Sequence, residues 1–282
     1  MTRLRKLPRG LSVVSVLRNA ALIALAAVTL APFVWMVATS LKAPDEILTR
    51  DFHLWPHRLW AAENYASAFA AVPLGRYLLN GVIVTATILA LQLLIAVPAA
   101  FALSKSEFRG RGLLFGAVLF GLLVPYHAIA VPLFVGLHAL GLLDTYAALV
   151  TPFAISVFGI FLMRQFFQGI PGELVDAARM DGMSELAIVW RVMVPAAGPA
   201  ISAFAIFSVV AHWNDYFWPL VAVSSDTLFT PPLGVVAFRN DDAGTNYGSL
   251  MAAATVIVLP LVAAFLLAQR RFLEGIAFAG LK

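Results

Sequence analysis

The 282-residue chain alternates between long apolar stretches and short polar connections. A membrane-spanning helix needs about 20 mostly apolar residues. The apolar stretches lack the alternation over about 10 residues that is typical of membrane β-strands. The pattern therefore predicts an all-α integral membrane protein with six spans, over residues 20–41, 77–104, 113–137, 146–167, 196–223 and 247–269.

Composition supports this class, because 61% of the residues are hydrophobic and only 12% are charged. A soluble domain averages about 45–50% apolar and about 25% charged residues. The absence of cysteine excludes disulfides, thiolate metal sites and cysteine nucleophiles. The basic residues are scattered among short connections rather than gathered on one face, so nucleic-acid binding is not expected.

The distribution of Lys and Arg predicts the orientation. With the N-terminus inside, 14 of the 19 basic residues fall in inner segments and 5 in outer ones, so both termini are expected in the cytoplasm. A cleaved signal peptide is the alternative for the first apolar run. That run is longer than a usual signal core and has no clear cleavage site after it, which favours an uncleaved helix. We expect one membrane domain over residues 1–282.

A charged segment stands out in this apolar chain between the fourth and fifth spans, on the expected cytoplasmic side. It reads "PGELVDAARMDGMSELAIVWRVMVP", residues 171–195. Pro171 and Gly172 end the preceding helix, and good helix formers follow. Gly182 interrupts them, Ser184 can cap a second helix, and Pro195 ends it. The sequence predicts a helix, a glycine turn and a second helix.

Short isolated helices are marginal in water, so the pair must pack on something. Its apolar positions follow helical spacing: Leu174, Ala177, Ala178, Leu186, Ile188, Val189 and Val192. One reading is an amphipathic pair on the bilayer surface or under the bundle. The other is a segment that docks on a cytoplasmic partner. The residues by themselves leave both open.

The spacing of this segment resembles the coupling loop of ABC-importer permeases. That pattern is Glu-Ala-Ala, three residues, Gly, nine residues, Ile, one residue and Leu-Pro. Here Asp176, Ala177 and Ala178 are followed by Gly182 and then by Val192, Val194 and Pro195 at the same gaps. Asp for Glu and valine at both aliphatic positions are conservative departures.

Other stretches extend the resemblance to the carbohydrate-uptake branch, and most of all to maltose-permease-like second subunits. They are Glu63–Val84, Ala99–Leu114, Gly141–Val150, His212–Leu220 and Leu266–Lys282. The tail "GIAFAGLK" departs from the family's usual "GLTAGAVKG". The likeness therefore covers nearly the whole chain.

The resemblance implies a type I ABC-importer permease in the bacterial inner membrane, with no catalysis or cofactor of its own. Its expected partners are a second homologous permease, two cytoplasmic ATPases that bind ATP and magnesium, an extracytoplasmic binding protein, a sugar and membrane lipid. No phosphate-binding loop motif occurs in the chain, so ATP must be bound by a partner. The implied coupling residues are Glu173, Asp176, Ala177, Ala178, Asp181, Gly182 and Pro195.

Polar residues within the spans are candidates for the translocation path, because they are costly in a bilayer. The main group is His212, Trp213, Asn214, Asp215 and Tyr216, which suits either sugar contact or a structural or gating role. His127, between Pro125 and Pro132, suits a kinked third span and can line a cavity or simply pack. Gln92 can form an interhelical hydrogen bond or face the cavity.

The outer connections 42–76 and 224–246 are either binding-protein contacts or solvated loops, and the second favours contact through its prolines and glycines. The sequence bears on three alternative functions. An intramembrane enzyme is disfavoured, because no serine-nucleophile or His-Glu metal motif occurs. An ion-driven secondary transporter lacks the paired intramembrane acids or inverted halves that support it. An ABC permease for a non-sugar solute such as glycerol phosphate stays open.

Overall fold

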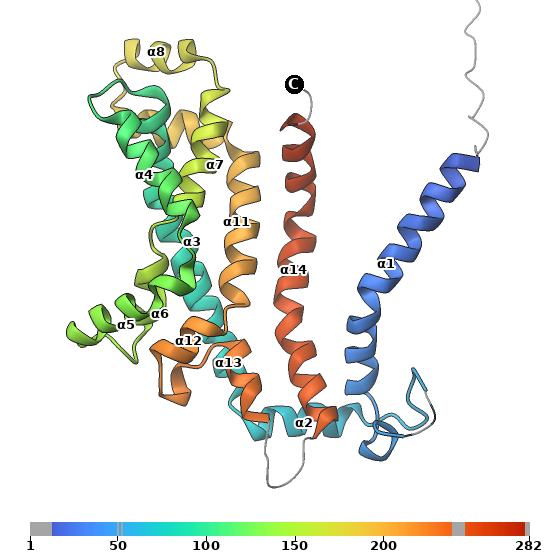
Figure 1. Cartoon of the computed structure of the whole chain (residues 1–282). Coiled ribbons are helices and arrows are strands. Elements are labelled where there is room, and N and C mark those ends of the chain that lie inside the picture. Colours follow the sequence, from blue (N-terminus) through green and yellow to red (C-terminus); the bar gives the residue numbers. More distant parts are fainter. Residues whose placement is uncertain (1–12, 50, 52, 239–245, 280–282) are drawn as a thin grey trace, which may run out of the picture.

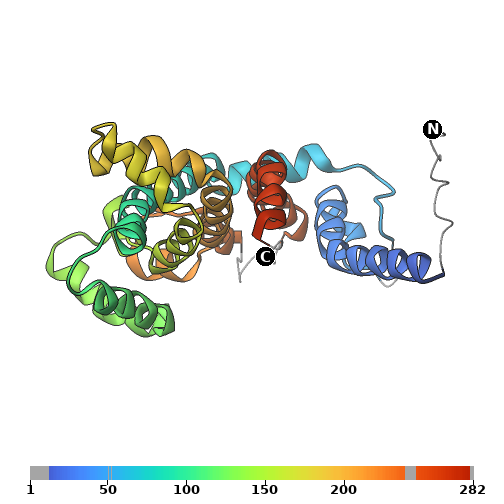
Figure 2. The same cartoon turned by 90° about the horizontal axis from the view of Figure 1, so that it is seen from above.

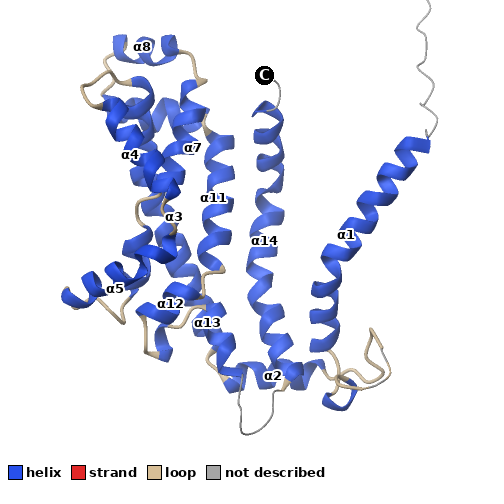
Figure 3. Ribbon diagram, viewed as in Figure 1, coloured by secondary structure: helices blue, strands red, loops and turns tan. Residues whose placement is uncertain are grey.

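The structure is a computed structural model that describes residues 13–49, 51, 53–238 and 246–279. Within these ranges every regular element is a helix, and an isolated bridge between Lys42 and Leu59 is the only extended pairing (Figure 3). The all-α class is therefore confirmed for the described part of the chain. Several residues used to predict orientation and outer contacts lie outside it, among them Arg50, residues 239–245 and Lys282.

Three helices are by themselves long and apolar enough to cross a membrane. They lie within α1 (Val13–Ser40), α3 (Leu74–Lys105) and α14 (Tyr247–Ala279). Their qualifying segments, Val14–Ser40, Leu74–Lys105 and Tyr247–Leu267, have mean hydropathies of 2.3, 2.3 and 2.6. These helices coincide with the first, second and sixth predicted spans.

The third predicted span is broken rather than continuous. Helix α4 (Arg111–Leu123) ends before Pro125, and η2 (Tyr126–Ile129) and α5 (Ala130–Ala139) continue at 97° to it. Val124 is extended, with ψ of 117°, because the ring of a following proline disfavours helical backbone. Pro132 lies inside α5 and does not break it. The expected kink is therefore a sharp turn at Pro125.

The fourth and fifth predicted spans are also interrupted. Helices α6 (Tyr146–Val150) and η3 (Thr151–Phe153) meet α7 (Val157–Gln168) at 41°. Residues 196–223 do not form one helix, because α11 (Gly198–Trp213) stops and α12 (Phe217–Ala222) starts again. In the break, the Asp215 Oδ1 atom accepts a hydrogen bond from the Trp218 amide at 3.2 Å. A short polar side chain thus satisfies the free backbone group that opens α12.

Shorter elements connect these helices at the two ends of the molecule. At one end, here called the α8 end, the chain forms α8 (Gly172–Met180), α9 (Glu185–Ile188), a π-helical turn η4 (Val189–Met193) and α10 (Val194–Ala196). At the other, the α2 end, are η1 (Pro44–Glu46), α2 (Ala61–Ala71), η5 (Asp226–Leu228), α13 (Pro231–Val235) and η6 (Val236–Phe238).

The long helices run between these two ends (Figure 1). Helices α3, α4, α7 and α11 form one bundle, and α14 packs on α11. In both views α14 lies between this bundle and α1 (Figures 1 and 2). Helix α1 contacts α14 but buries none of its most apolar 18-residue window inside the chain. The apolar surface of α1 is therefore free to contact lipid or another membrane helix.

The largest buried cluster joins the bundle to the α8 end. It contains Val97, Ala100, Phe101, Met163, Phe167, Val175, Ala178, Ile188, Val189, Met193, Ala197, Ala200 and Phe204. A second cluster surrounds Trp218, whose Nε1 atom donates to the Ala148 carbonyl at 2.8 Å. Because the first cluster includes residues of α8 and α9, the segment between α7 and α11 is part of the core and not a loose connection.

Candidate functional site

The 171–195 loop folds as the sequence predicts, with two helices around a glycine turn. Gly182 has φ of +77°, a backbone conformation that other residues rarely adopt. A Cβ atom there would meet nothing within 4 Å, so the backbone and not packing requires the glycine. The Ser184 Oγ atom accepts a hydrogen bond from the Ala187 amide at 3.3 Å and caps α9. Pro195 lies in α10, and the chain then turns by 84° into α11.

One face of this loop is fastened to the membrane helices. Val175 is 1% exposed and Ala178 6% exposed. Both belong to the buried cluster that contains Phe101 of α3 and Phe167 of α7. Any displacement of α8 must therefore also displace the side chains of the bundle against which it packs, because close-packed interiors transmit strain.

The opposite face of the loop is exposed and partly apolar. Leu174 is 45%, Met180 90% and Leu186 64% exposed. Among the predicted coupling residues, Ala178 is buried, and the exposed ones are Glu173, Asp176, Ala177, Asp181, Gly182 and Pro195. The structure thus splits the apolar positions that the sequence grouped together. Ile188 and Val189 pack inward, whereas Leu174, Ala177 and Leu186 do not.

An ion cluster bridges the two helices of the loop on this exposed side. Arg179 contacts Glu185 through Nε (2.9 Å to Oε1) and Nη2 (3.2 Å to Oε2), and its Nη1 lies 3.1 Å from the Asp176 Oδ1. The hydrogen bonds from Arg179 lower the pKa of Glu185. The sequence analysis assigned no role to Arg179 or to the buried Val175. Arg179 lies six residues before Glu185, and Val175 lies three residues before Ala178. This spacing was the signal in the sequence that could have identified them.

A polar cavity of about 580 Å³ lies beside this cluster. It is lined by Lys105, Ser106, Glu107, Gly172, Val175, Asp176, Arg179 and Glu185. The Lys105 Nζ atom donates to the Ile170 carbonyl and ties the end of α3 to the start of the loop. The α8 end therefore combines an apolar attachment, a charged bridge and an open polar recess.

Gln92 lies in the bundle and forms interhelical hydrogen bonds. Its side chain is buried and donates to the Phe153 carbonyl at 2.9 Å. It accepts from the Ser208 hydroxyl at 2.6 Å, and its Nε2 lies 3.1 Å from the His212 Nε2. Of the two roles that the sequence left open for Gln92, the structure shows the interhelical one, joining α3, η3 and α11.

The residues 212–216 point in different directions and do not form one surface. Trp213 is 4% exposed, and its Nε1 atom donates to the Ile257 carbonyl of α14 at 3.1 Å. Asn214 is exposed and bonds to its own helix at the Val210 carbonyl, and Tyr216 is exposed. In this conformation the Trp213 ring holds helices together and is closed to a solute.

His212 and Asp215 line a small cavity together with Phe153, Trp218, Thr230 and four apolar neighbours. Its volume is about 10 Å³, which has room for one water molecule at most. His127 is exposed just beyond the break at Pro125, with its ring centroid 4.7 Å from that of Phe217. The predicted path residues are thus near one another around two helix breaks, but the cavity that they share here is too small for a sugar ring.

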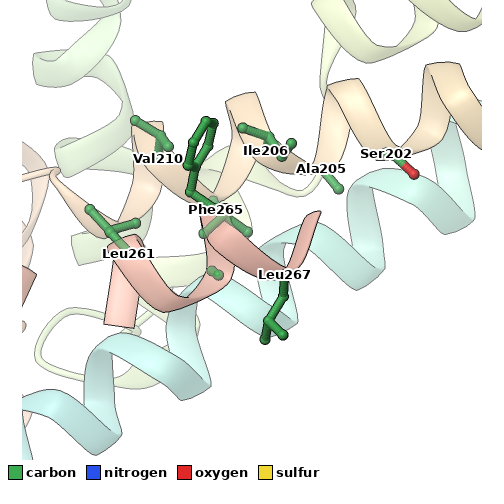
Figure 4. Close-up of a pocket in the computed structure, with 9 residues that line it drawn as sticks. Ser202, Ala205, Ile206, Val210, Leu261, Phe265 and Leu267 are labelled. Carbon is green, nitrogen blue, oxygen red and sulfur yellow. The ribbon is translucent and has the colours of Figure 1, made fainter. Parts of the chain in front are cut away.

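An apolar groove of about 370 Å³ runs between α11 and α14 (Figure 4). It is lined by Ser202, Ala205, Ile206, Val209, Val210, Leu261, Ala264, Phe265 and Leu267.

As for metals, the described residues contain no group of three or more His, Asp or Glu side chains placed to hold an ion.

Residues 92–277 match the family model of the binding-protein-dependent transport system inner membrane component. The match covers the C-terminal part of α3, all of α4, α7 and α11, and the 171–195 loop. The chain belongs to this family. It is a transport permease of the inner membrane and not an enzyme, as the sequence predicted.

Similar proteins agree with this family membership. The permease is 36% identical over 203 residues to the arabinooligosaccharides transport system permease protein AraQ of Halalkalibacterium halodurans, which covers 72% of each chain. It is 32% identical over 262 residues to the diacetylchitobiose uptake system permease protein NgcG of Streptomyces coelicolor, covering 92% of this chain and 86% of that protein.

The permease also shares its fold with a chain in the crystal structure of a bacterial ABC transporter involved in the import of the acidic polysaccharide alginate. The TM-score is 0.82 at 24% sequence identity, over 95% of this chain and 99% of the other. The overall fold of this chain is therefore one already found in an ABC transporter. The predicted resemblance is confirmed.

Proposed function

We propose that this permease is one of two homologous transmembrane subunits of an ATP-driven, binding-protein-dependent sugar importer. Its partners are then two cytoplasmic ATPases and an extracytoplasmic binding protein. The similarity to AraQ, a permease of an arabinooligosaccharides transport system, and to NgcG, a permease of a diacetylchitobiose uptake system, supports a sugar as the solute. A non-sugar solute such as glycerol phosphate is the second candidate, because permeases for such solutes share these features.

We further propose six spans, with both termini and the α8 end in the cytoplasm. Three continuous helices and three bent pairs supply up to six spans by length and composition. The excess of Lys and Arg in the expected inner segments supports the orientation. The apolar surface of α1 and the groove between α11 and α14 support a homologous permease as the partner within the bilayer.

The observation that carries the proposal is the two-faced 171–195 loop. Val175 and Ala178 fasten it to the bundle, while Leu174, Ala177 and Met180 remain exposed at the end of the molecule. A helix with an exposed apolar face suits a groove on a partner protein. Glu173, Asp176, Ala177, Asp181 and Gly182 form or flank that face and would dock on an ATPase. Closure of the ATPases would then move the bundle through Ala178.

The translocation path is proposed to run past the two helix breaks. Interrupted helices in transporters line solute sites, since unwound backbone is tolerated only where it lines a cavity or is buried in protein. His127, Asp215 and Tyr216 lie at those breaks, and Gln92 and His212 are hydrogen-bonded behind them. Asn214 is exposed beside them, and Trp213 would hold α11 against α14 while the path opens.

The test uses the assembled transporter, in nanodiscs with its partner permease, ATPase and binding protein. Ala177→Arg places a charge on the exposed face of α8 without disturbing the buried Ala178. Ala70→Arg, at an exposed alanine of α2, is the matched control. We expect Ala177→Arg to lose ATPase copurification and the control to retain it. Full ATPase binding and stimulated hydrolysis by Ala177→Arg would contradict the docking role.

The solute is tested separately by uptake into proteoliposomes loaded with ATP. Sugars of one to several rings and glycerol phosphate are each supplied with the binding protein. ATP-dependent uptake of a sugar is expected. Uptake that continues without ATP and follows an ion gradient would support a secondary carrier and contradict the proposal.

A further inference from the structure

The two helices of the 171–195 loop belong to different arms of the bundle. Helix α8 follows α7, whereas α9 leads through η4 and α10 into α11. Between them lie Asp181 to Ser184, with Gly182 in a left-handed conformation and open space around it. Backbone hydrogen bonds close the turn, from the Gly182 amide to the Arg179 carbonyl at 3.0 Å and from the Met183 amide to the Ala178 carbonyl at 3.1 Å. These bonds end α8, and the angle between α8 and α9 is left to contacts made by side chains, since Gly182 has none to pack between them.

Two other contacts restrain that angle. On the inner side, Val175 and Ala178 share a buried cluster with Ile188 and Val189. On the exposed side, Arg179 spans the turn and contacts Glu185 with a two-pronged hydrogen bond, while its remaining nitrogen holds Asp176. The apolar contact sets how close the helices lie, but it is non-directional. The planar guanidinium fork is directional and specifies orientation.

The side chains of this ion cluster are exposed to water. Arg179 has a 37% exposed side chain, and Glu185 and Asp176 are 56% and 70% exposed. Exposed ion pairs add little to folding stability, so stability does not account for a bridge built from three hydrogen bonds. All three guanidinium nitrogens of Arg179 are occupied within the chain, which leaves few donors for a partner.

We propose that Arg179 is a positioning residue that locks α8 and α9 into one rigid body by bridging to Glu185. It would act through Glu185 and Asp176 and not by direct contact with the ATPase. A displacement of α8 then moves α7 and α11 together, whereas without the bridge the chain would bend at Gly182. This inference rests on the proposed function, since the displacement is the one that the ATPase causes when it binds the loop.

Exchange of the two charges tests this inference in the assembled transporter. Arg179→Glu and Glu185→Arg each place like charges across the turn, and the double variant restores the pair in reverse. We expect each single variant to keep ATPase copurification but to lose most of the hydrolysis stimulated by the binding protein and most of the solute moved per ATP. The double variant is expected to regain a large part of both.

Two milder variants guard against misfolding. Arg179→Lys keeps the charge but not the fork, because lysine is a point donor, and it is expected to lower transport per ATP at unchanged basal hydrolysis. Arg109→Glu reverses an exposed charge at the same end and is the matched control, expected to behave as wild type.

The outcomes separate the inference from the proposed function. If the wild-type assembly shows no ATPase binding, the proposed function fails. If the wild type is stimulated but the double exchange is as defective as the singles, Arg179 acts on the ATPase itself and the inference is overturned. Wild-type transport per ATP in both Arg179 variants would overturn it as well.

Discussion

Two connections at opposite ends of the permease are held by opposite means. The 171–195 loop, at the α8 end, has its directional contacts on an exposed ion cluster. Residues 222–235, at the α2 end, are here called the 222–235 segment. They are fixed by the side-chain amide of Asn80 and by close packing against the backbone of Gly81 and Gly234. Asn80 donates to the Thr227 and Phe229 carbonyls, each at 2.9 Å, and accepts from the Tyr146 hydroxyl at 2.6 Å.

Both connections rest on the same helix. The start of α3 carries Asn80 and Gly81 beneath the 222–235 segment, and its last turns carry Val97 and Phe101 beneath the 171–195 loop. The comparison shows that one end is packed to fit a single arrangement. The other end leaves one face of α8 exposed and bridges its two helices with charges that water can reach.

The largest expected effect is at Gly234, in the 222–235 segment. A Cβ atom there would lie 2.1 Å from the Cδ2 atom of Tyr77, whose ring is buried. Gly234→Ala should therefore lower stability by about 1–3 kcal/mol, the usual cost of overpacking. Thermal unfolding in detergent measures it. Gly75→Ala is the control, because its Cβ would meet nothing within 4 Å. Equal melting temperatures for the wild type and Gly234→Ala would show that close packing at Gly234 does not fix the 222–235 segment.

Loss of the Asn80 amide should come next. Asn80→Leu leaves two backbone carbonyls and the Tyr146 hydroxyl without this partner, at a cost of about 1–3 kcal/mol for a buried unsatisfied group. We expect faster amide hydrogen exchange throughout the 222–235 segment and no change in α8. Asn214→Leu removes an exposed amide that bonds its own helix and should leave the segment protected. Unchanged exchange in Asn80→Leu would show that packing alone fixes the segment.

At the other end, removal of the Ser184 cap should have a moderate effect. Ser184→Ala loses the bond to the Ala187 amide and should cost about 1 kcal/mol, seen as faster exchange over α9. Ser184→Asp retains a capping oxygen and should restore protection. If both variants exchange alike, the cap does not stabilise the loop.

The smallest expected effect is a loss of protection in acid that depends on Asp144, which precedes α6. Its carboxylate accepts hydrogen bonds from the Ser225 hydroxyl and from the Ser225 and Ser224 amides at 2.8 and 2.9 Å, and these lower its pKa. A lowered folded-state pKa stabilises the fold above the ordinary carboxyl pKa, and the contribution is lost as the pH falls below it. The protection factors of the Ser224 and Ser225 amides, corrected for the pH dependence of intrinsic exchange, should therefore fall in acid. Asp144→Asn should flatten this dependence, and a persistent fall in protection would exclude Asp144 as its source.

Much of the 171–195 loop was predictable because its signals are local. The turn at Gly182, the cap at Ser184 and the register from Asp176 to Pro195 depend on neighbours a few residues away. The choice between Leu174 and Val175 for the buried face was not predictable in this way. The two are adjacent, about 100° apart on a helix, and only the position of Phe101 and Phe167 decides which of them packs inward.

By itself, the sequence determined that this is an all-helical membrane protein with two helices and a glycine turn before α11, because hydrophobic run length and cap spacing are properties of the chain alone. The permease assignment came from the resemblance carried by the spacing from Asp176 to Pro195 and from the family match. The tertiary structure decided the rest. It turned the third span by 97° at Pro125, joined Trp213 to Ile257 and enclosed Gln92 among three elements. These features depend on contacts between residues far apart in the chain, and local helix propensity does not predict such contacts.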